Sequence, residues 1–173
     1  MRVNVGNSGP AFALCASAQN QSQTNSQPTV TVIVTSDKDL GKQYGSHAAV
    51  YLNNTSDGPV LYDPAGSYQN NTRGSGGILT KEDDGATVAD YTKYQSSTGS
   101  KVSAVTIPVS AADQEKIYKN AQSIGDPRGM NCAISVSTAL KGVGPFKNWE
   151  VISLPGNLLK AAREAKKAEE ASE

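Results

Sequence analysis

One cysteine, one histidine and one aspartate are the residues of this chain whose types and spacing suit nucleophilic catalysis. Cys132 follows Asn131 where a short apolar helix should begin, directly behind the loop of residues 126–129. The dipole of a helix lowers the pKa of a cysteine in its first turn, and the thiolate is the reactive form. The Asn131 side chain can cap this helix. The alternative is a buried structural cysteine in a helix rich in Ala, Ile and Val, because free cysteines are often buried.

A cysteine nucleophile needs a base, and His47 is the only histidine in the chain. It opens a predicted strand over residues 45–52. Side chains alternate along a strand, so His47, Ala49 and Tyr51 should share one face. The alternative is a solvated surface histidine at the start of a strand.

Asp63 closes the next predicted strand, residues 59–63. The turn-forming residues 53–58 join the two strands into an antiparallel hairpin. In this hairpin the residue opposite His47 should lie near Asp63 or Pro64. A carboxylate beside an imidazole fixes its tautomer and raises its basicity. The alternative is a turn aspartate that only ends the strand before a proline.

The composition is that of one folded domain without a strong electrostatic partner. The chain has 173 residues, of which 37% are hydrophobic and 6% aromatic, and this length supports a sizeable core. A formal net charge of zero argues against bulk binding to nucleic acid or to an anionic membrane. Cys15 and Cys132 could form a single disulfide, but they make neither a disulfide framework nor a metal-ligand spacing. We expect no metal and no cofactor.

The chain is predicted to divide into an arm, a domain and a tail. Residues 1–28 are rich in Gln, Asn and Ser and form a flexible N-terminal arm and linker. Residues 29–160 form the domain, and residues 161–173 form a charged helical tail. No apolar run approaches the ~20 residues of a membrane span. The short apolar patch at residues 11–16 is preceded by polar residues and does not make a convincing signal peptide.

Hydrophobic periodicity predicts an α+β fold, with an antiparallel sheet of about four to six strands packed against helices. Strands are expected at residues 29–35, 45–52, 59–63, 101–109 and 149–154. Helices are expected at residues 111–124, capped by Ser110, at residues 132–140, and from Pro155 onward. Residues 65–77 form a long loop of the kind that lines binding sites, and residues 88–94 fit either a helical turn or a short strand.

Three segments resemble the permuted branch of the NlpC-type papain-like superfamily, which includes the lecithin–retinol acyltransferase-like proteins. The segments are residues 45–52, 60–66 and 131–136. Members of that branch carry a histidine early on a strand, a second polar residue on the neighbouring strand, and an Asn-Cys pair that begins a later helix. The resemblance implies a circularly permuted papain-like fold. It makes Cys132 the nucleophile, His47 the general base and Asp63 the residue that orients the base. The acyltransferases have a histidine at the position of Asp63.

The resemblance implies acyl transfer through a thioester, with amide hydrolysis as the leading reaction. The backbone N–H of Cys132 is a natural oxyanion donor because it lies at a helix start. Tyr51, Arg73 and Asn131 are expected to bind the substrate. Two alternatives stay open. One is an acyltransferase or lipase-like thiol enzyme on the same fold, and the other is a non-enzymatic binding domain with a buried Cys132.

Residues 153–158 are similar to the ends of toxin domains carried on Rhs-type or type VI secretion effectors. This similarity implies an antibacterial toxin that is secreted or delivered into a target cell, with the periplasm as its site of action. The substrate would then be a peptide, and peptidoglycan stem peptides would be the leading choice. The partner would be a cognate immunity protein made by the producing cell.

Overall fold

The computed structural model describes residues 26–36, 46–68, 77–80, 87–97, 99–127 and 129–172. Its strands are β1 Thr29–Ser36, β2 His47–Thr55, β3 Gly58–Asp63, β4 Gly77–Leu79 and β5 Lys101–Pro108. Its helices are α1 Val88–Ser96, α2 Ala111–Ile124, α3 Cys132–Leu140 and α4 Pro155–Glu170, with a 3₁₀ turn at Gly144–Phe146. Arg73 and Cys15 lie outside the described residues.

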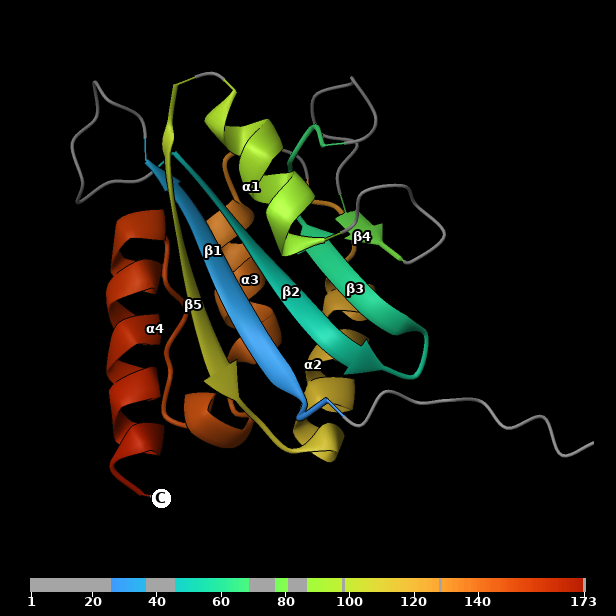
Figure 1. The fold of residues 1–173 in the computed structure, drawn as a ribbon, viewed down its shortest axis with the longest axis vertical. Coiled ribbons are helices and arrows are strands. Elements are labelled where there is room, and N and C mark those ends of the chain that lie inside the picture. The colour runs from blue at the N-terminus through green and yellow to red at the C-terminus, as the bar shows by residue number, and fades with distance from the viewer. Residues whose placement is uncertain are drawn as a thin grey trace, which may run out of the picture.

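The described strands form one antiparallel sheet in the order β4-β3-β2-β1-β5 (Figure 1). β1 lies between β2 and β5 because its residues are β-branched and buried on both faces, as a central strand requires. This sheet of five described strands, combined with four helices, confirms the predicted α+β class and strand number. β4 is an edge strand that the sequence did not predict.

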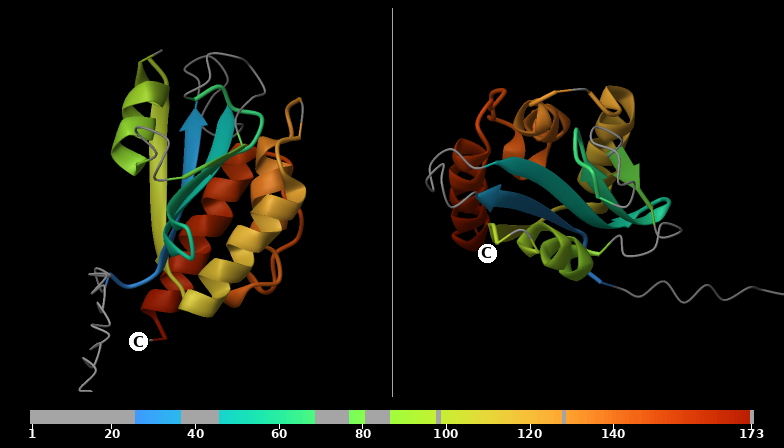
Figure 2. Two further views of the ribbon diagram at one scale, coloured as in Figure 1. Left: turned by 90° about the vertical axis from the view of Figure 1, so that its right-hand side faces the viewer. Right: turned by 90° about the horizontal axis from the view of Figure 1, so that it is seen from above.

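The helices cover the two faces of the sheet unequally. α2, α3 and α4 pack against one face, and α1 lies on the other (Figure 2). The larger core lies between the sheet and the three helices, and it includes Ala48 and Val50 of β2 and Cys132 of α3. The smaller core lies under α1, where Ala49 of β2 packs with Tyr91. The alternation of β2 therefore sends consecutive residues to different cores, as predicted.

The β2–β3 hairpin has a longer β2 and a different register than the sequence predicts. β2 continues to Thr55, and Val50 pairs with Tyr62. Extending that register places His47 opposite residue 65, next to the predicted neighbourhood of Asp63 and Pro64. β2 is longer because tertiary partners bind its polar end: Asn53 Oδ1 accepts from Thr29 N at 2.7 Å, and Asn54 N donates to Gln114 Oε1 at 3.0 Å.

Residues 149–154 do not form the predicted strand. They follow the 3₁₀ turn as irregular chain, and Ile152 N donates to the Ser137 hydroxyl of α3 at 2.9 Å instead of joining the sheet. A side chain of α3 thus satisfies the backbone group that would otherwise need a neighbouring strand.

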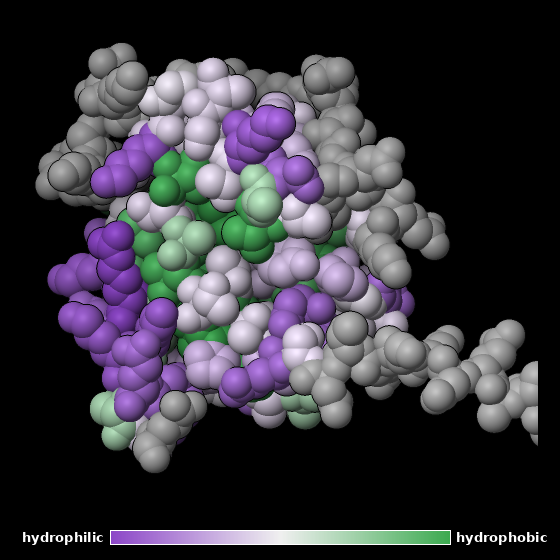
Figure 3. Space-filling model, in the orientation of Figure 1, coloured by the Kyte–Doolittle hydropathy of each residue, from purple (hydrophilic) through white to green (hydrophobic). Residues whose placement is uncertain are grey.

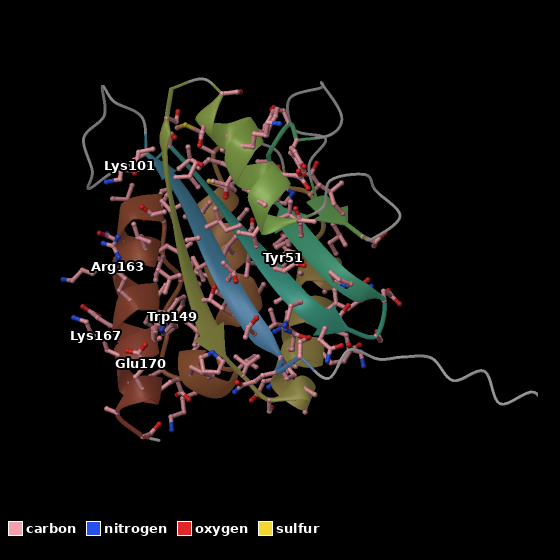
Figure 4. All side chains as sticks on the ribbon, in the orientation of Figure 1. Tyr51, Lys101, Trp149, Arg163, Lys167 and Glu170 are labelled. Carbon is pink, nitrogen blue, oxygen red and sulfur yellow. The ribbon has the colours of Figure 1, made fainter. Side chains whose placement is uncertain are left out.

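α4 is one continuous helix across the predicted boundary at residue 160. Ala162 and Ala165 are buried against the sheet, whereas charged residues of both signs cover the other side. These residues form the hydrophilic edge on the left of Figure 3, and Arg163 and Lys167 point away from the sheet in Figure 4. Among the described helices, none combines the length and the apolar character needed to cross a bilayer.

Candidate active site

His47 and Asp63 meet at the end of the sheet where β2 begins and β3 ends. His47 Nε2 lies 2.5 Å from Asp63 Oδ1. The Asp63 side chain is fully buried, and the His47 side chain is 16% exposed. A hydrogen bond this short between an imidazole and a carboxylate is charge-assisted. It leaves the other ring nitrogen, Nδ1, available to a third group.

A tight turn after β3 holds the Asp63 carboxylate in place. Gly66 N donates to the Asp63 carbonyl at 3.1 Å, and Ala65 between them has a φ of +58°. Proline followed by a residue with positive φ is the pattern of a type II turn, whose second central position normally favours glycine. The turn folds the chain back so that Gly66 packs directly on the carboxylate, where a β-carbon would come within 2.0 Å of Oδ2.

Cys132 reaches the same place from the other side of the sheet. It is the first residue of α3, is 6% exposed and packs in the larger core with Ala48. Its thiol lies close enough to the His47 side chain for each group to shift the pKa of the other. His47 therefore lies between a thiol that arrives with α3 and a carboxylate that faces α1. The structure brings together the three residues predicted to carry the chemistry.

Two hydrogen bonds fix the loop before Cys132 to the end of β3. Tyr62 Oη donates to the Gly125 carbonyl at 2.8 Å. Ala65 N donates to Asp126 Oδ1 at 2.9 Å. Both bonds join residues more than sixty positions apart in the sequence, one pair differing by 63 and the other by 61. These bonds hold Gly125 and Asp126, which precede Cys132, in place relative to the end of β3 and so to Asp63.

The pKa values of His47 and Cys132 are shifted by their neighbours. Burial lowers the pKa of His47, but hydrogen bonds to Asp63 and Cys132 and the charges on both outweigh burial and raise the pKa from 6.5 to about 10. Burial also opposes ionisation of Cys132, but the hydrogen bond and positive charge of His47 and the backbone groups of Ala48 and Ala133 lower the thiol pKa below 9.0. The two shifts have opposite directions, and together they favour a thiolate–imidazolium pair over the neutral pair more than in the isolated groups.

The start of α3 differs from the predicted cap. Asn131 makes no side-chain cap hydrogen bond, so the prediction that it caps the helix is wrong. Its φ of −100° and ψ of 10° are not the extended conformation of a capping residue, which Ser110 adopts at α2 with a φ of −73° and a ψ of 156°. The backbone N–H of Ala133 is directed at the Cys132 sulfur. The first turn of α3 thereby directs a backbone donor at the thiolate.

Of the three residues predicted to bind substrate, only Asn131 lies beside Cys132 in the described structure. Asn131 is adjacent to Cys132 and is partly exposed. Tyr51 packs in the smaller core on the α1 side, about 13 Å along β2 from His47 at ~3.3 Å per residue, and Figure 4 shows it on the open part of the sheet. Tyr51 is therefore not brought together with Cys132. Arg73 lies outside the described residues.

Two further polar residues at the site were not found from the sequence. Tyr91 Oη donates to Asp63 Oδ1 at 2.6 Å, and Gln95 Nε2 donates to Tyr91 Oη at 2.9 Å. Both belong to α1, a segment for which the sequence pattern did not distinguish a helix from a strand. Their spacing of four residues places them on one side of a helix, but only the fold shows that this side faces Asp63.

The described residues contain no group of three or more His, Cys, Asp or Glu side chains arranged to hold a metal ion. A surface depression of about 480 Å³ lies at the opposite end of the sheet, between Pro108, Asp113, Lys147 and Glu169. Neither Cys132 nor His47 lines this depression, so it is separate from the candidate active site.

Comparisons of the chain with protein-family models, with curated proteins and with solved structures find no match.

Proposed function

We propose that this protein is a cysteine hydrolase that cleaves an amide bond through a thioester intermediate. The observation that supports the proposal is the position of His47, which lies near the Cys132 thiol on one side and hydrogen-bonds with the buried Asp63 carboxylate on the other. A nucleophile, a base and a group that orients the base are the parts that such a reaction needs.

The proposed reaction begins with the Cys132 thiolate, which attacks the carbonyl carbon of the amide. The negative charge moves to the carbonyl oxygen, and the backbone N–H of Cys132, at the start of α3, donates to that oxygen. The His47 imidazolium gives its proton to the departing amine as the C–N bond breaks. An acyl thioester and neutral His47 remain.

Water completes the reaction. Neutral His47 takes a proton from a water molecule, whose oxygen attacks the thioester carbonyl. The C–S bond breaks, the acid product leaves, and the thiolate–imidazolium pair forms again. Asp63 accepts a hydrogen bond from His47 Nε2 throughout, so it holds the ring with Nδ1 toward the thiol and stabilises the imidazolium.

The proposed fold relationship is a circularly permuted papain-like domain. The chain order is His47, Asp63, Cys132, with the histidine and aspartate on antiparallel neighbouring strands and the cysteine at the start of a later helix. This order is the one that the resemblance to the permuted branch implies. Asp63, where the acyltransferases have a histidine, favours hydrolysis of an amide over transfer of a lipid acyl group.

The proposed substrate is a peptide amide of peptidoglycan, and the proposed role is that of an antibacterial toxin delivered to the periplasm. This part rests on the similarity of residues 153–158 to the ends of secreted toxin domains. It implies that the producing cell makes an immunity protein that blocks access to Cys132.

Digestion of purified peptidoglycan tests the reaction. The purified protein is incubated with intact sacculi and with isolated stem peptides, and the fragments are identified by mass spectrometry. We expect new amine and carboxylate ends with the wild type and none with Cys132→Ala. Unchanged fragments, with a wild-type protein that still cleaves an activated thioester or lipid ester, would overturn the amide assignment in favour of the acyltransferase alternative.

A further inference from the structure

The proposed catalytic pair leaves a charge that the core must stabilise. A thiolate on Cys132, an imidazolium on His47 and a carboxylate on Asp63 sum to one negative charge, and all three groups are largely or fully buried. Burying an unbalanced charge is costly unless hydrogen-bond donors surround it. The question is which groups supply those donors to Asp63.

The two carboxylate oxygens of Asp63 differ in their hydrogen-bond partners. Its Oδ1 accepts hydrogen bonds from two groups, His47 Nε2 and Tyr91 Oη. Its Oδ2 is buried and has no hydrogen-bond partner among the described residues. Gly66 packs against that oxygen and leaves no room for a side chain there. Tyr91 is therefore the second of the two donors that the structure gives to this carboxylate.

The direction of the Tyr91 hydrogen bond is set by its neighbours in α1 and β1. Gln95 Nε2 donates into the Tyr91 oxygen at 2.9 Å, which leaves the phenol proton for Asp63. Thr35 Oγ1 donates to Gln95 Oε1 at 3.4 Å, which turns the amide so that its nitrogen faces Tyr91. Thr35 is also the cross-strand partner of His47. The chain of hydrogen bonds thus returns to the strand pair that carries the histidine.

Tyr91 keeps its proton under all conditions in which the enzyme would work. Its ring is 1% exposed and packs edge-on against Tyr68, with ring centroids 5.2 Å apart. Burial and the adjacent Asp63 charge raise the pKa of Tyr91 well above its usual 10.0. The residue is a permanent donor in a fixed position.

We propose that Tyr91 is a positioning residue of the active site, which holds the Asp63 carboxylate aimed at His47, and that Gln95 orients the Tyr91 hydroxyl. This inference rests on the proposed cysteine chemistry and adds a fourth side chain and its support to it. Tyr91 acts through Asp63 and His47 and does not touch the reacting atoms.

Removal of the hydroxyl has a defined consequence. Tyr91→Phe keeps the ring and its packing but leaves Asp63 with His47 as its single hydrogen-bond donor. The orientation of the carboxylate then depends on the hydrogen bond to His47 and on the packing of Gly66 alone. His47 loses part of the support for its positive charge, and the Cys132 thiolate loses part of its counter-ion.

Alkylation of Cys132 by iodoacetamide tests this without a substrate. The measurement uses the full chain with Cys15→Ser, so that a single thiol reacts, and records the second-order rate constant from pH 5 to 10. We expect Tyr91→Phe to lower the rate constant at pH 6 roughly tenfold, as for loss of a hydrogen bond to a charged group. We also expect it to shift the pH profile toward that of a free thiol.

Tyr118→Phe is the matched control. Tyr118 also donates to a carboxylate, Asp57 Oδ2 at 2.6 Å, but at the hairpin turn at the far end of β2 and β3. We expect Tyr118→Phe to leave the alkylation profile unchanged, whatever it does to the thermal unfolding temperature.

Gln95→Glu is a second variant that keeps the proposal testable if Tyr91→Phe folds poorly. The introduced carboxylate accepts a hydrogen bond from the Tyr91 hydroxyl and draws that hydroxyl away from Asp63. We therefore expect the same shift in the pH profile of alkylation. A folded Tyr91→Phe or Gln95→Glu protein with the parent's profile would overturn the role of Tyr91 alone. A parent protein whose thiol reacts at pH 6 no faster than free cysteine would overturn the catalytic proposal and this one with it.

Discussion

Gly66 lies so close to Asp63 that a β-carbon at position 66 would come within 2.0 Å of the carboxylate Oδ2. The turn after β3 makes this contact. The backbone of residue 66 therefore packs directly against one side of the Asp63 carboxylate. The orientation of Asp63 toward His47 thus depends on the absence of a side chain three residues later.

Gly66→Ala is therefore expected to displace Asp63 and disable the site. Adding a methyl group to a filled space costs about 1–3 kcal/mol of stability, and a reacting group misplaced by about 1 Å loses on the order of 10²-fold in rate. Peptidoglycan hydrolysis and thermal unfolding measure the two effects.

Gly58→Ala is the control, because Gly58 has a φ of +83° but no atom within 4 Å of a β-carbon. It tests backbone strain without a clash. We expect it to lower stability and to keep activity, and a Gly66→Ala protein as active as this control would contradict the packing argument.

Asp63→Asn should lower the rate of hydrolysis by about 10²–10⁴-fold while the protein stays folded. The amide keeps the shape of the carboxylate but cannot balance the charge on His47. Asp57→Asn, at the far hairpin turn, removes the carboxylate that accepts from Tyr118 and should leave the rate unchanged. Equal rates for the two variants would remove Asp63 from the mechanism.

The dependence of activity on pH should follow the two shifted groups. The proposed reaction needs the thiolate of Cys132, whose pKa is lowered from 9.0, and the imidazolium of His47, whose pKa is raised to about 10. We expect kcat/KM to fall on the basic side near pH 10, where His47 loses its proton, and to fall on the acid side as the pH drops through the lowered pKa of Cys132. Asp63→Asn should move the basic limb to lower pH.

Stability should change with pH in a matching way. His47 has a raised pKa, so its contribution to stability is complete below its ordinary value of 6.5 and is lost as the pH rises through about 10. Cys132 has a lowered pKa, so its contribution is complete above 9.0 and is lost as the pH falls through the lowered value. Unfolding free energies of the wild type minus those of His47→Gln should shrink between pH 6.5 and 10, and a constant difference would contradict the assigned shift.

Asp126→Ala should weaken the connection between the Cys132 loop and the end of β3. The variant removes the acceptor for Ala65 N, and a hydrogen bond to a charged group contributes about 1.5–3 kcal/mol. We expect a loss of activity of about tenfold or more, because Cys132 is no longer fixed relative to His47.

Glu115→Ala is its matched control. Glu115 Oε2 accepts from Ser56 N at 3.0 Å in the hairpin turn far from Cys132. We expect it to affect stability alone. If both variants retained full activity, the loop would not depend on Asp126.

The parts of the fold that follow from local pattern were predictable from the sequence. The β-branched run of β1, the Ser110 cap of α2 and the helix from Cys132 depend on a few neighbouring residues. The approach of His47 to Asp63 followed from the length of one hairpin, although the pairing is shifted along the strands, because a long imidazole reaches a carboxylate diagonally across the strand pair.

Contacts between distant segments were not predictable in this way. The roles of Tyr91 and Gln95 depend on α1 lying over the end of β3, and the extra length of β2 depends on Gln114 in α2. The sequence pattern likewise did not show that Ser137 would bind the segment predicted as the last strand. Each of these depends on side chains that are at least 15 positions apart.

The most direct test of the central claim is the reactivity of Cys132 at pH 6 with and without His47. In a Cys15→Ser background, iodoacetamide should alkylate Cys132 much faster than it alkylates free cysteine at that pH, because His47 lowers the pKa of the thiol and so raises its thiolate fraction. His47→Gln should abolish this difference. A Cys132 that reacts at the rate of free cysteine, and whose rate does not change with His47→Gln, would contradict the proposed nucleophile.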